Sequence, residues 1–372
     1  FLISVMAPAS MLWGQNTYVP DDNFEQALID LGYDDTLDDY VLTANISGVT
    51  SLNVSQKEIS NLTGIEAFTA LTELVCYNNY LTSLDLSANT ALNILEGNYN
   101  QLTSLGVSAN SALTTLNCNH NQLTSLDVSA NSALTTLDVE GNQLTSLNVS
   151  SNTALTNLQC GENELTSLDV SANTALTSLS CYGNQLTSLD VSANTALTSL
   201  RCHYNQLTSL DVSSNTALYG LDCDSNQLTT LDVSSNTALT ILNCDSNQLI
   251  HLNMKNGVTD QLTTFDATGN SLTCIEVNAE DVDYATANWT SANGNIDAGV
   301  GFSVVCAPEG YTYVPDDNFE QALIDLGYDD TLDDYVLTAN ISVVTSLNVS
   351  QKEISNLTGI ESFTALTHLQ CE

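Results

Sequence analysis

A repeat of 21 residues constrains this chain more than any other feature of its sequence. The unit from Leu186 to Gln206 reads LTSLDVSANTALTSLRCHYNQ, and close variants follow one another without a break. A unit this short cannot bury an apolar face alone, so neighbouring units must stack as the coils of a solenoid. Successive units begin at Leu81, Leu102, Leu123, Leu144, Leu165, Leu186, Leu207 and Leu228, and a ninth, with a two-residue insertion, begins at Leu249.

Each unit predicts one short strand with alternating sides. Leu200 and Cys202 would point into the core, whereas Arg201 between them would point outward. The strands of successive coils would pair as a parallel sheet with ~4.8 Å between neighbours. The pattern Leu-Asp-Val-Ser-x-Asn in the other half of the unit also alternates. It predicts a second sheet or an extended run on the opposite side of the coil, without helices.

Two residue types recur in rows along the array. A row of Asn directly follows the expected strands, where buried amides can satisfy backbone groups that leave the sheet. A row of Cys shares its position with Gly97 and Val139, so we interpret it as small apolar filler rather than as metal ligands, which must converge on a point. The cysteine row comprises Cys76, Cys118, Cys160, Cys181, Cys202, Cys223 and Cys244.

The ends of the array have different sequences, which predicts end caps. The pattern from Val19 to Gly32 is typical of a short amphipathic helix with acidic residues in its first turn. Residues 17–76 recur as 312–371 with four differences in 60 positions, at 48/343, 67/362, 73/368 and 75/370. The apolar, uncharged start indicates a remnant of a secretory signal, with a buried N-terminal strand as the alternative.

These patterns predict six segments. They are 1–14, a signal peptide remnant; 15–48, an N-terminal cap; 49–271, the repeats; 272–307, a C-terminal cap; 308–342, a second N-terminal cap; and 343–372, a truncated second repeat array. Cys274 and Cys306 lie outside the cysteine row and flank the end of the array. In an exported chain they are the natural disulfide pair.

The segment Leu197-x-x-Leu200-x-Cys202-x-x-Asn205-x-Leu207 matches the signature L-x-x-L-x-L-x-x-N/C-x-L. Together with the repeated Asn-Gln-Leu-Thr-Ser-Leu-Asp-Val-Ser, it resembles the secreted leucine-rich repeat proteins of Bacteroidetes-type bacteria. The 22-residue spacing from Leu52 to Leu74 is similar to the repeat spacing of internalins. The resemblance implies a leucine-rich repeat solenoid, mostly β, with a small helical N-terminal cap. It also implies a secreted or cell-surface binding protein, often exported through a C-terminal sorting domain, with no shared catalytic residues.

Composition excludes several classes of partner. Only 4 Lys and Arg stand against 44 Asp and Glu, for a formal net charge of −40. Such a chain cannot neutralise phosphates, so we expect no nucleic acid partner and no anionic membrane surface as a partner. The four His lie in different coils, and no metalloprotease, phosphate-loop or nucleophile-elbow motif is present. We therefore expect no enzyme, no cofactor and no metal site.

A binding surface is favoured because outward residues vary while the scaffold hardly changes. Arg201 is the only cation in the regular array, and aromatic and Arg side chains are typical interface anchors. The alternative is drift on a solvated surface. We expect a ligand that is neutral or basic overall, a protein or cell-surface molecule, on the concave sheet. The expected contact residues are Tyr182, Arg201, His203, Tyr204, Asp222 and Asp224.

A row of carboxylates on the other half of the coils supports a second hypothesis. Like charges at this spacing repel unless they are solvated, hydrogen-bonded or bridged by a cation, and calcium prefers such oxygen ligands. We favour solvated carboxylates that accept bonds from nearby Ser and Thr. The competing function is a structural or adhesive surface element without a specific ligand, ordered by calcium. The row comprises Asp127, Asp169, Asp190, Asp211 and Asp232, with Asn148 between the first two.

Overall fold

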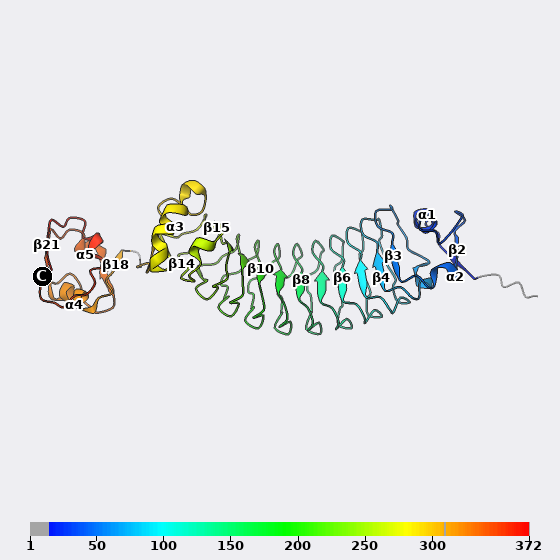
Figure 1. Cartoon of the computed structure of the whole chain (residues 1–372), viewed down its shortest axis with the longest axis horizontal. Coiled ribbons are helices and arrows are strands. Elements are labelled where there is room, and N and C mark those ends of the chain that lie inside the picture. The colour runs from blue at the N-terminus through cyan, green and yellow to red at the C-terminus, as the bar shows by residue number, and fades with distance from the viewer. Residues whose placement is uncertain (1–14, 309, 372) are drawn as a thin grey trace, which may run out of the picture.

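The computed structural model describes residues 15–308 and 310–371, so the expected signal remnant lies outside the described residues. The repeats form an elongated solenoid whose coils stack in chain order (Figure 1). Each coil contributes one short strand to a parallel sheet of 11 strands, hereafter the main sheet. Its strands are β3 (Ser51–Asn53), β4 (Glu73–Val75), β5 (Ile94–Glu96), β6 (Thr115–Asn117), β7 (Thr136–Asp138), β8 (Asn157–Gln159), β9 (Ser178–Ser180), β10 (Ser199–Arg201), β11 (Gly220–Asp222), β13 (Ile241–Asn243) and β15 (Thr264–Asp266).

The strands pair in register, so equivalent residues of neighbouring coils lie side by side. Leu200 on β10 lies opposite Leu179 on β9 and Leu221 on β11. Leu200 and Cys202 are fully buried, and Arg201 between them is exposed. The expected alternation is therefore confirmed, and the core is a continuous stack of leucines between the two sides of the solenoid.

The opposite side of the coils is a regular sheet only toward the end of the array. There, β12 (Thr230–Asp232), β14 (His251–Asn253), β16 (Cys274–Glu276) and β17 (Gly301–Ser303) form a four-stranded sheet. The earlier coils run extended, and a single bridge joins Asp85 to Gly106. The sheet begins where Leu-Thr-Thr-Leu replaces Leu-Thr-Ser-Leu, and Thr has the higher strand propensity. Both expected forms thus occur, in different coils.

Helices are confined to the ends and to irregular coils. The α-helices are α1 (Asp22–Asp30), α2 (Thr43–Ile46), α3 (Val282–Asn288), α4 (Asp317–Asp325) and α5 (Thr338–Ile341). Short 3-10 turns occur at Ile65–Ala67, between β3 and β4, and at Thr259–Gln261, in the unit that begins at Leu249. The described part of the chain contains no helix that is long and apolar enough to cross a membrane.

Buried asparagines hold each coil to the next. The Asn205 side chain donates to the carbonyls of Cys181, Cys202 and His203 at 3.0–3.2 Å and accepts from the Leu186 amide at 3.0 Å. These bonds satisfy backbone groups, as the sequence predicts, and they span two coils. A second row, which the sequence analysis did not single out, includes Asn194. It is fully buried and donates to two carbonyls of the preceding coil at 2.9–3.0 Å.

The cysteine row forms a buried ladder along the core. All seven thiols of the row are free and buried. Burial raises the pKa of Cys76 and of Cys181 to about 12, because the thiolate would lack solvent. The ladder cysteines are therefore neutral apolar filler, as expected.

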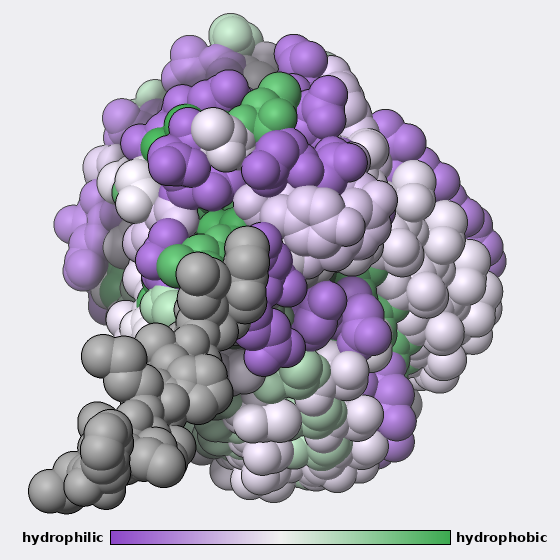
Figure 2. Space-filling model, turned by 90° about the vertical axis from the view of Figure 1, so that its right-hand side faces the viewer, coloured by the Kyte–Doolittle hydropathy of each residue, from purple (hydrophilic) through white to green (hydrophobic). Residues whose placement is uncertain are grey.

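The carboxylate of Asp21 forms several of the bonds between the N-terminal cap and the first coil. Strand β1 (Asn16–Tyr18) pairs antiparallel with β2 (Tyr40–Leu42) beside α1. One oxygen of Asp21 accepts from the Asn23 and Phe24 amides at the start of α1. The other accepts from the Ser60 amide at 2.9 Å and the Ser60 hydroxyl at 2.7 Å. Viewed from this end, the surface outside the grey atoms is mainly polar with isolated apolar spots, as a solenoid end requires (Figure 2).

The other end of the array is closed by α3 and a disulfide. Trp289 is buried, with ring centroids 4.4 Å from Phe265 and 5.8 Å from Phe302. Cys274 is bonded to Cys306, the pair that the sequence favours. The last coil therefore buries its apolar surface under an aromatic cluster.

The repeated segment after the disulfide folds as the first cap does. Strands β18 (Tyr311–Tyr313) and β19 (Tyr335–Leu337) pair antiparallel, and β20 (Ser346–Asn348) pairs in parallel with β21 (His368–Gln370). This segment has a separate apolar core that includes Phe319 and Phe363. Asp316 makes the same bonds to the Ser355 amide and hydroxyl as Asp21 makes to Ser60.

Candidate binding surface on the main sheet

The expected contact residues lie at or just past the C-terminal ends of three neighbouring strands, β9, β10 and β11. Arg201 and Asp222 are the last residues of β10 and β11, and His203 follows β10 by two residues. Arg201 and Tyr204 are exposed, the latter by 63%. The side chains of His203 and Asp222 are 17% and 29% exposed. The structure therefore brings His203 and Asp222, two of the expected contact residues, together at a partly exposed position.

Asp224 departs from the expectation. It is buried, at 7% exposure, rather than outward-facing. Its side chain accepts a hydrogen bond of 3.2 Å from the Asn243 amide group on the next strand. The residue lies two positions past the end of β11, so strand alternation no longer decides its direction.

Aromatic rings hold His203 in place. The imidazole stacks on Tyr182 with centroids 4.6 Å apart and planes within 10°, and Tyr204 meets it edge-on at 5.5 Å. The Tyr182 hydroxyl donates a 2.8 Å hydrogen bond to Glu140, two coils away. The ring lies over Gly161, where an added Cβ would come within 2.6 Å of it. Gly161 thus provides the space that lets Tyr182 reach Glu140.

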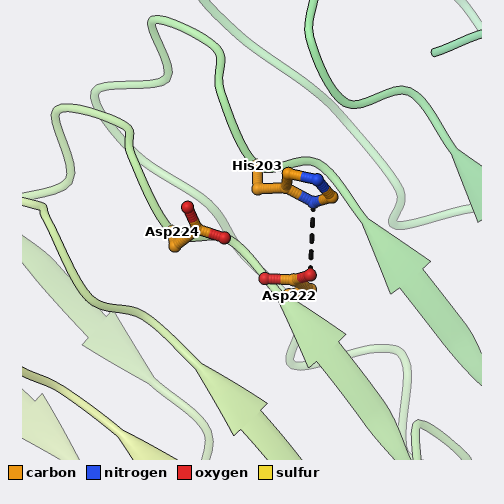
Figure 3. A group of neighbouring side chains, drawn as sticks. All are labelled: His203, Asp222 and Asp224. Atoms are coloured by element: carbon orange, nitrogen blue, oxygen red, sulfur yellow. Dashed lines mark ion pairs between the residues drawn. The ribbon is translucent and has the colours of Figure 1, made fainter.

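His203, Asp222 and Asp224 converge on one point from two coils. One ligand atom from each lies within 4.8 Å of the others, and Nδ1 of His203 is 3.2 Å from Oδ2 of Asp222. Figure 3 shows the three side chains directed toward one another. Burial lowers the pKa of His203 and, together with the adjacent Asp222, raises the pKa of Asp224.

Arg201 is available to a ligand. Within the described residues its guanidinium has no carboxylate within 4.0 Å, whereas the Lys side chains at 57, 255 and 352 are each paired. An exposed, unpaired guanidinium beside aromatic rings offers a bidentate site for a carboxylate.

The aspartate row on the other half of the coils forms hydrogen bonds with residues close by in the sequence. Asp190 and Asp211 each accept a 2.9 Å bond from the amide two residues later, at Ser192 and Ser213. These serines lower the pKa of both carboxyls by hydrogen bonding. The row is therefore exposed and locally hydrogen-bonded, which is the interpretation that the sequence analysis favours.

Sequence reasoning missed the convergence of His203 with two carboxylates. The sequence places Tyr182, His203, Asp224 and Asp245 at one position of successive units, a row that runs along the axis. Only the lateral packing of coils adds Asp222, which belongs to a different position of the unit. A search for ligating residues in two neighbouring positions of adjacent units would have found the group.

The architecture and the repeat define a leucine-rich repeat solenoid. The functional domain of internalin J from Listeria monocytogenes, a structure that includes a cysteine ladder, is 33% identical with a TM-score of 0.58; the match covers 74% of this chain and 75% of that one. The chain therefore belongs to the internalin-like leucine-rich repeat proteins.

Other comparisons agree on the fold. An internalin, InlF, from Listeria monocytogenes matches 95% of this chain and 96% of its own, with a TM-score of 0.63 and 19% identity, which shows the fold alone. Over 74 residues the chain is 40% identical to internalin J of Listeria monocytogenes serotype 4b; this match spans 20% of the chain and only 8% of that relative. No family model matches the chain.

Proposed function

We propose that this chain is a non-enzymatic binding protein that recognises another protein or a cell-surface ligand through the outward side of the main sheet. The observation that carries the proposal is the exposed, unpaired Arg201 beside a fixed aromatic cluster, on a scaffold that is otherwise repeated from coil to coil. Arg and Tyr are the residue types that most often dominate binding energy.

Rigidity supports this use of the surface. His203 and Tyr182 are held by stacking, and Tyr182 is held further by Glu140. Side chains that are already ordered lose little conformational entropy when they bind. The cluster also lies in the middle of the array, where coils on both sides stabilise it.

Charge narrows the class of ligand. The chain carries a formal net charge of −40, and Asp222, Asp224 and Asp245 lie next to the aromatic cluster. A strongly anionic partner would be repelled. The ligand we propose is neutral or basic overall, with one acidic group to pair with Arg201, and is neither nucleic acid nor an anionic membrane surface.

The location we propose is secreted or cell-surface. The Cys274–Cys306 disulfide favours an oxidising compartment, and the similarity to internalins points the same way. We also propose the division into an N-terminal cap at 15–48, repeats at 49–271 and a C-terminal cap at 272–307, followed by a second cap at 308–342 and a second repeat array from 343.

The competing function is a structural or adhesive surface element without a specific ligand. The observation that favours it is the exposed aspartate row, which a divalent cation could bridge between molecules. Such adhesion would depend on cation concentration and would not depend on Arg201 or Tyr204.

A capture experiment separates the two functions. The full chain and an R201A/Y204A variant are immobilised and exposed to surface extracts of neighbouring bacterial or host cells. Saturable capture of a defined ligand that the double variant loses, and that a D190N/D211N control retains, supports the proposal. Diffuse, cation-dependent clumping that is equal for the parent chain and the R201A/Y204A variant contradicts it.

A further inference from the structure

We propose that His203, Asp222 and Asp224 form a binding site for one divalent transition-metal ion of the Zn²⁺ type. The three potential ligand atoms come from two neighbouring coils and lie within 4.8 Å of one another (Figure 3). Among the described residues, no other group of three His, Cys, Asp or Glu side chains meets this condition.

The donor set determines the kind of ion. One imidazole nitrogen and two carboxylate oxygens suit Zn²⁺ and its first-row neighbours, whereas Ca²⁺ and Mg²⁺ prefer oxygen ligands alone. Three protein ligands leave at least one coordination position open. His203 and Asp222 are partly exposed, so water or a ligand atom from solvent can occupy that position.

Within the part of the chain that the structure describes, two buried polar atoms at this point have no hydrogen-bond partner. They are Nδ1 of His203 and Oδ1 of Asp222. Leaving such atoms unsatisfied is costly, and native structures rarely do so without a reason. A bound cation would accept the lone pairs of both. Asp224 adds a carboxylate that is more than nine-tenths buried beside them.

The electrostatics of the cluster favour a cation. Asp222 and Asp224 are adjacent like charges, and one oxygen from each lies within 4.8 Å of the other. A divalent ion would remove this repulsion.

The cluster is held in position before any ion binds. Tyr182 fixes the plane of the His203 ring by stacking, and Glu140 fixes Tyr182. The in-register pairing of Arg201 with Asp222 sets the distance between the two coils. Metal sites gain affinity when neighbouring groups orient the ligands in this way.

The adjacent coils do not repeat the donor set. On one side, the corresponding positions hold Ser180 and Tyr182; on the other, they hold Asn243 and Asp245. The site is therefore a local property of two coils and not a feature of the repeat. It is also independent of the proposed protein-binding function, because metal affinity can be measured without a partner.

The test uses the untagged full chain carrying C371S, which removes the exposed thiol at Cys371. Titration calorimetry with ZnCl₂ should show one equivalent bound. H203A, D222N and D224N should each weaken binding by at least about tenfold. The absorption spectrum of the Co²⁺ complex should lack a thiolate charge-transfer band, because the ladder cysteines are not ligands.

Two matched variants serve as controls. H120A removes a histidine that also lies against a tyrosine, Tyr99, with centroids 4.5 Å apart. D245N removes the carboxylate that follows Asp224 in the same row. Both should retain full affinity, and circular dichroism should show the same fold for every variant.

Three results would overturn the proposal. The first is no saturable binding at Zn²⁺ concentrations up to about 1 mM, the range of very weak affinity. The second is unchanged affinity in folded H203A or D224N. The third is a Co²⁺ spectrum dominated by thiolate, which would place the metal on cysteine instead.

Discussion

The imidazole of His203 lies parallel to the ring of Tyr182, with centroids 4.6 Å apart and planes within 10°. The two residues occupy the same position of consecutive coils, so the stack follows directly from the in-register packing of the solenoid. Stacking turns the edge of the imidazole toward the next coil, where Nδ1 comes within 3.2 Å of Asp222. A contact between aromatic rings thereby orients a nitrogen that could act as a ligand.

Single substitutions locate the binding surface. R201A and Y204A should each weaken binding of the captured ligand by more than ~1 kcal/mol, since interface anchors of these types contribute at least that much. Affinity is measured by surface plasmon resonance on folded variants. D190N and D211N, on the other half of the coils, should bind as the parent does. If R201A and Y204A keep full affinity while D190N and D211N lose it, the ligand binds the other half of the coils, and our proposal is wrong.

The asparagine row is predicted to be a main source of stability. N205A leaves the Leu186 amide and several buried carbonyls without the partner they have now. We expect the free energy of unfolding to fall by at least about 2 kcal/mol, because an unsatisfied buried group costs ~1–3 kcal/mol. Urea denaturation measures this. Q206A, which alters the exposed neighbour, is the matched control and should be nearly neutral.

Thiol counting tests the cysteine chemistry. The chain has 10 Cys, of which Cys274 and Cys306 are bonded and the remaining eight are free. The unfolded, non-reduced protein should therefore react with eight equivalents of a thiol reagent. The folded protein should react rapidly with one, at the exposed Cys371, because the ladder thiols are buried and their thiolate forms are disfavoured. Ten equivalents after unfolding would rule out the disulfide.

Calcium should have little effect on the aspartate row. Asp190 and its equivalents already accept bonds from the following serines and are exposed. We expect millimolar Ca²⁺ to change the melting temperature no more than the same concentration of Mg²⁺ does. A saturable rise with Ca²⁺ alone would show binding to the folded state, since such a ligand stabilises by mass action, and would support the calcium-ordered alternative.

Acidification from neutral pH should first stabilise the protein. Burial raises the pKa of four carboxyls at or just past the ends of main-sheet strands, so folding disfavours their charged forms. These carboxyls are Glu96, Asp138, Asp224 and Asp245. Stability is gained as the pH falls through these folded pKa values and the folded state takes up protons that the unfolded state does not. Relief of the repulsion caused by the net charge of −40 acts in the same direction.

At pH values below the ordinary pKa of an aspartate side chain, the direction reverses. Serine hydrogen bonds lower the pKa of Asp127, Asp169, Asp190 and Asp211, so their contribution is lost as the pH falls through those lower values. The melting temperature, followed by circular dichroism, should therefore pass through a maximum at mildly acidic pH. D138N should flatten the rise between neutral pH and that maximum. A melting temperature that falls steadily from pH 7 downward would contradict this account.

The N-terminal cap shows how far sequence patterns reach. The helix expected between Val19 and Gly32 is present as Asp22–Asp30, and Gly32 adopts the left-handed conformation, φ 80°, that ends it. The pattern did not reveal that the second oxygen of Asp21 bonds to Ser60, 39 residues later. A capping residue is recognisable from its neighbours in sequence, whereas its contact with another coil is not.

The repeat by itself determined the solenoid, the inward leucines, the buried cysteine ladder and the asparagine row, because these depend only on spacing along one unit. The tertiary structure decided what happens between units. It buried Asp224, laid Tyr182 over Gly161, limited the second sheet to the last coils and brought Asp222 to His203. These outcomes depend on which side chains meet across coils at neighbouring positions, and on the space that a glycine or a bulky ring leaves there.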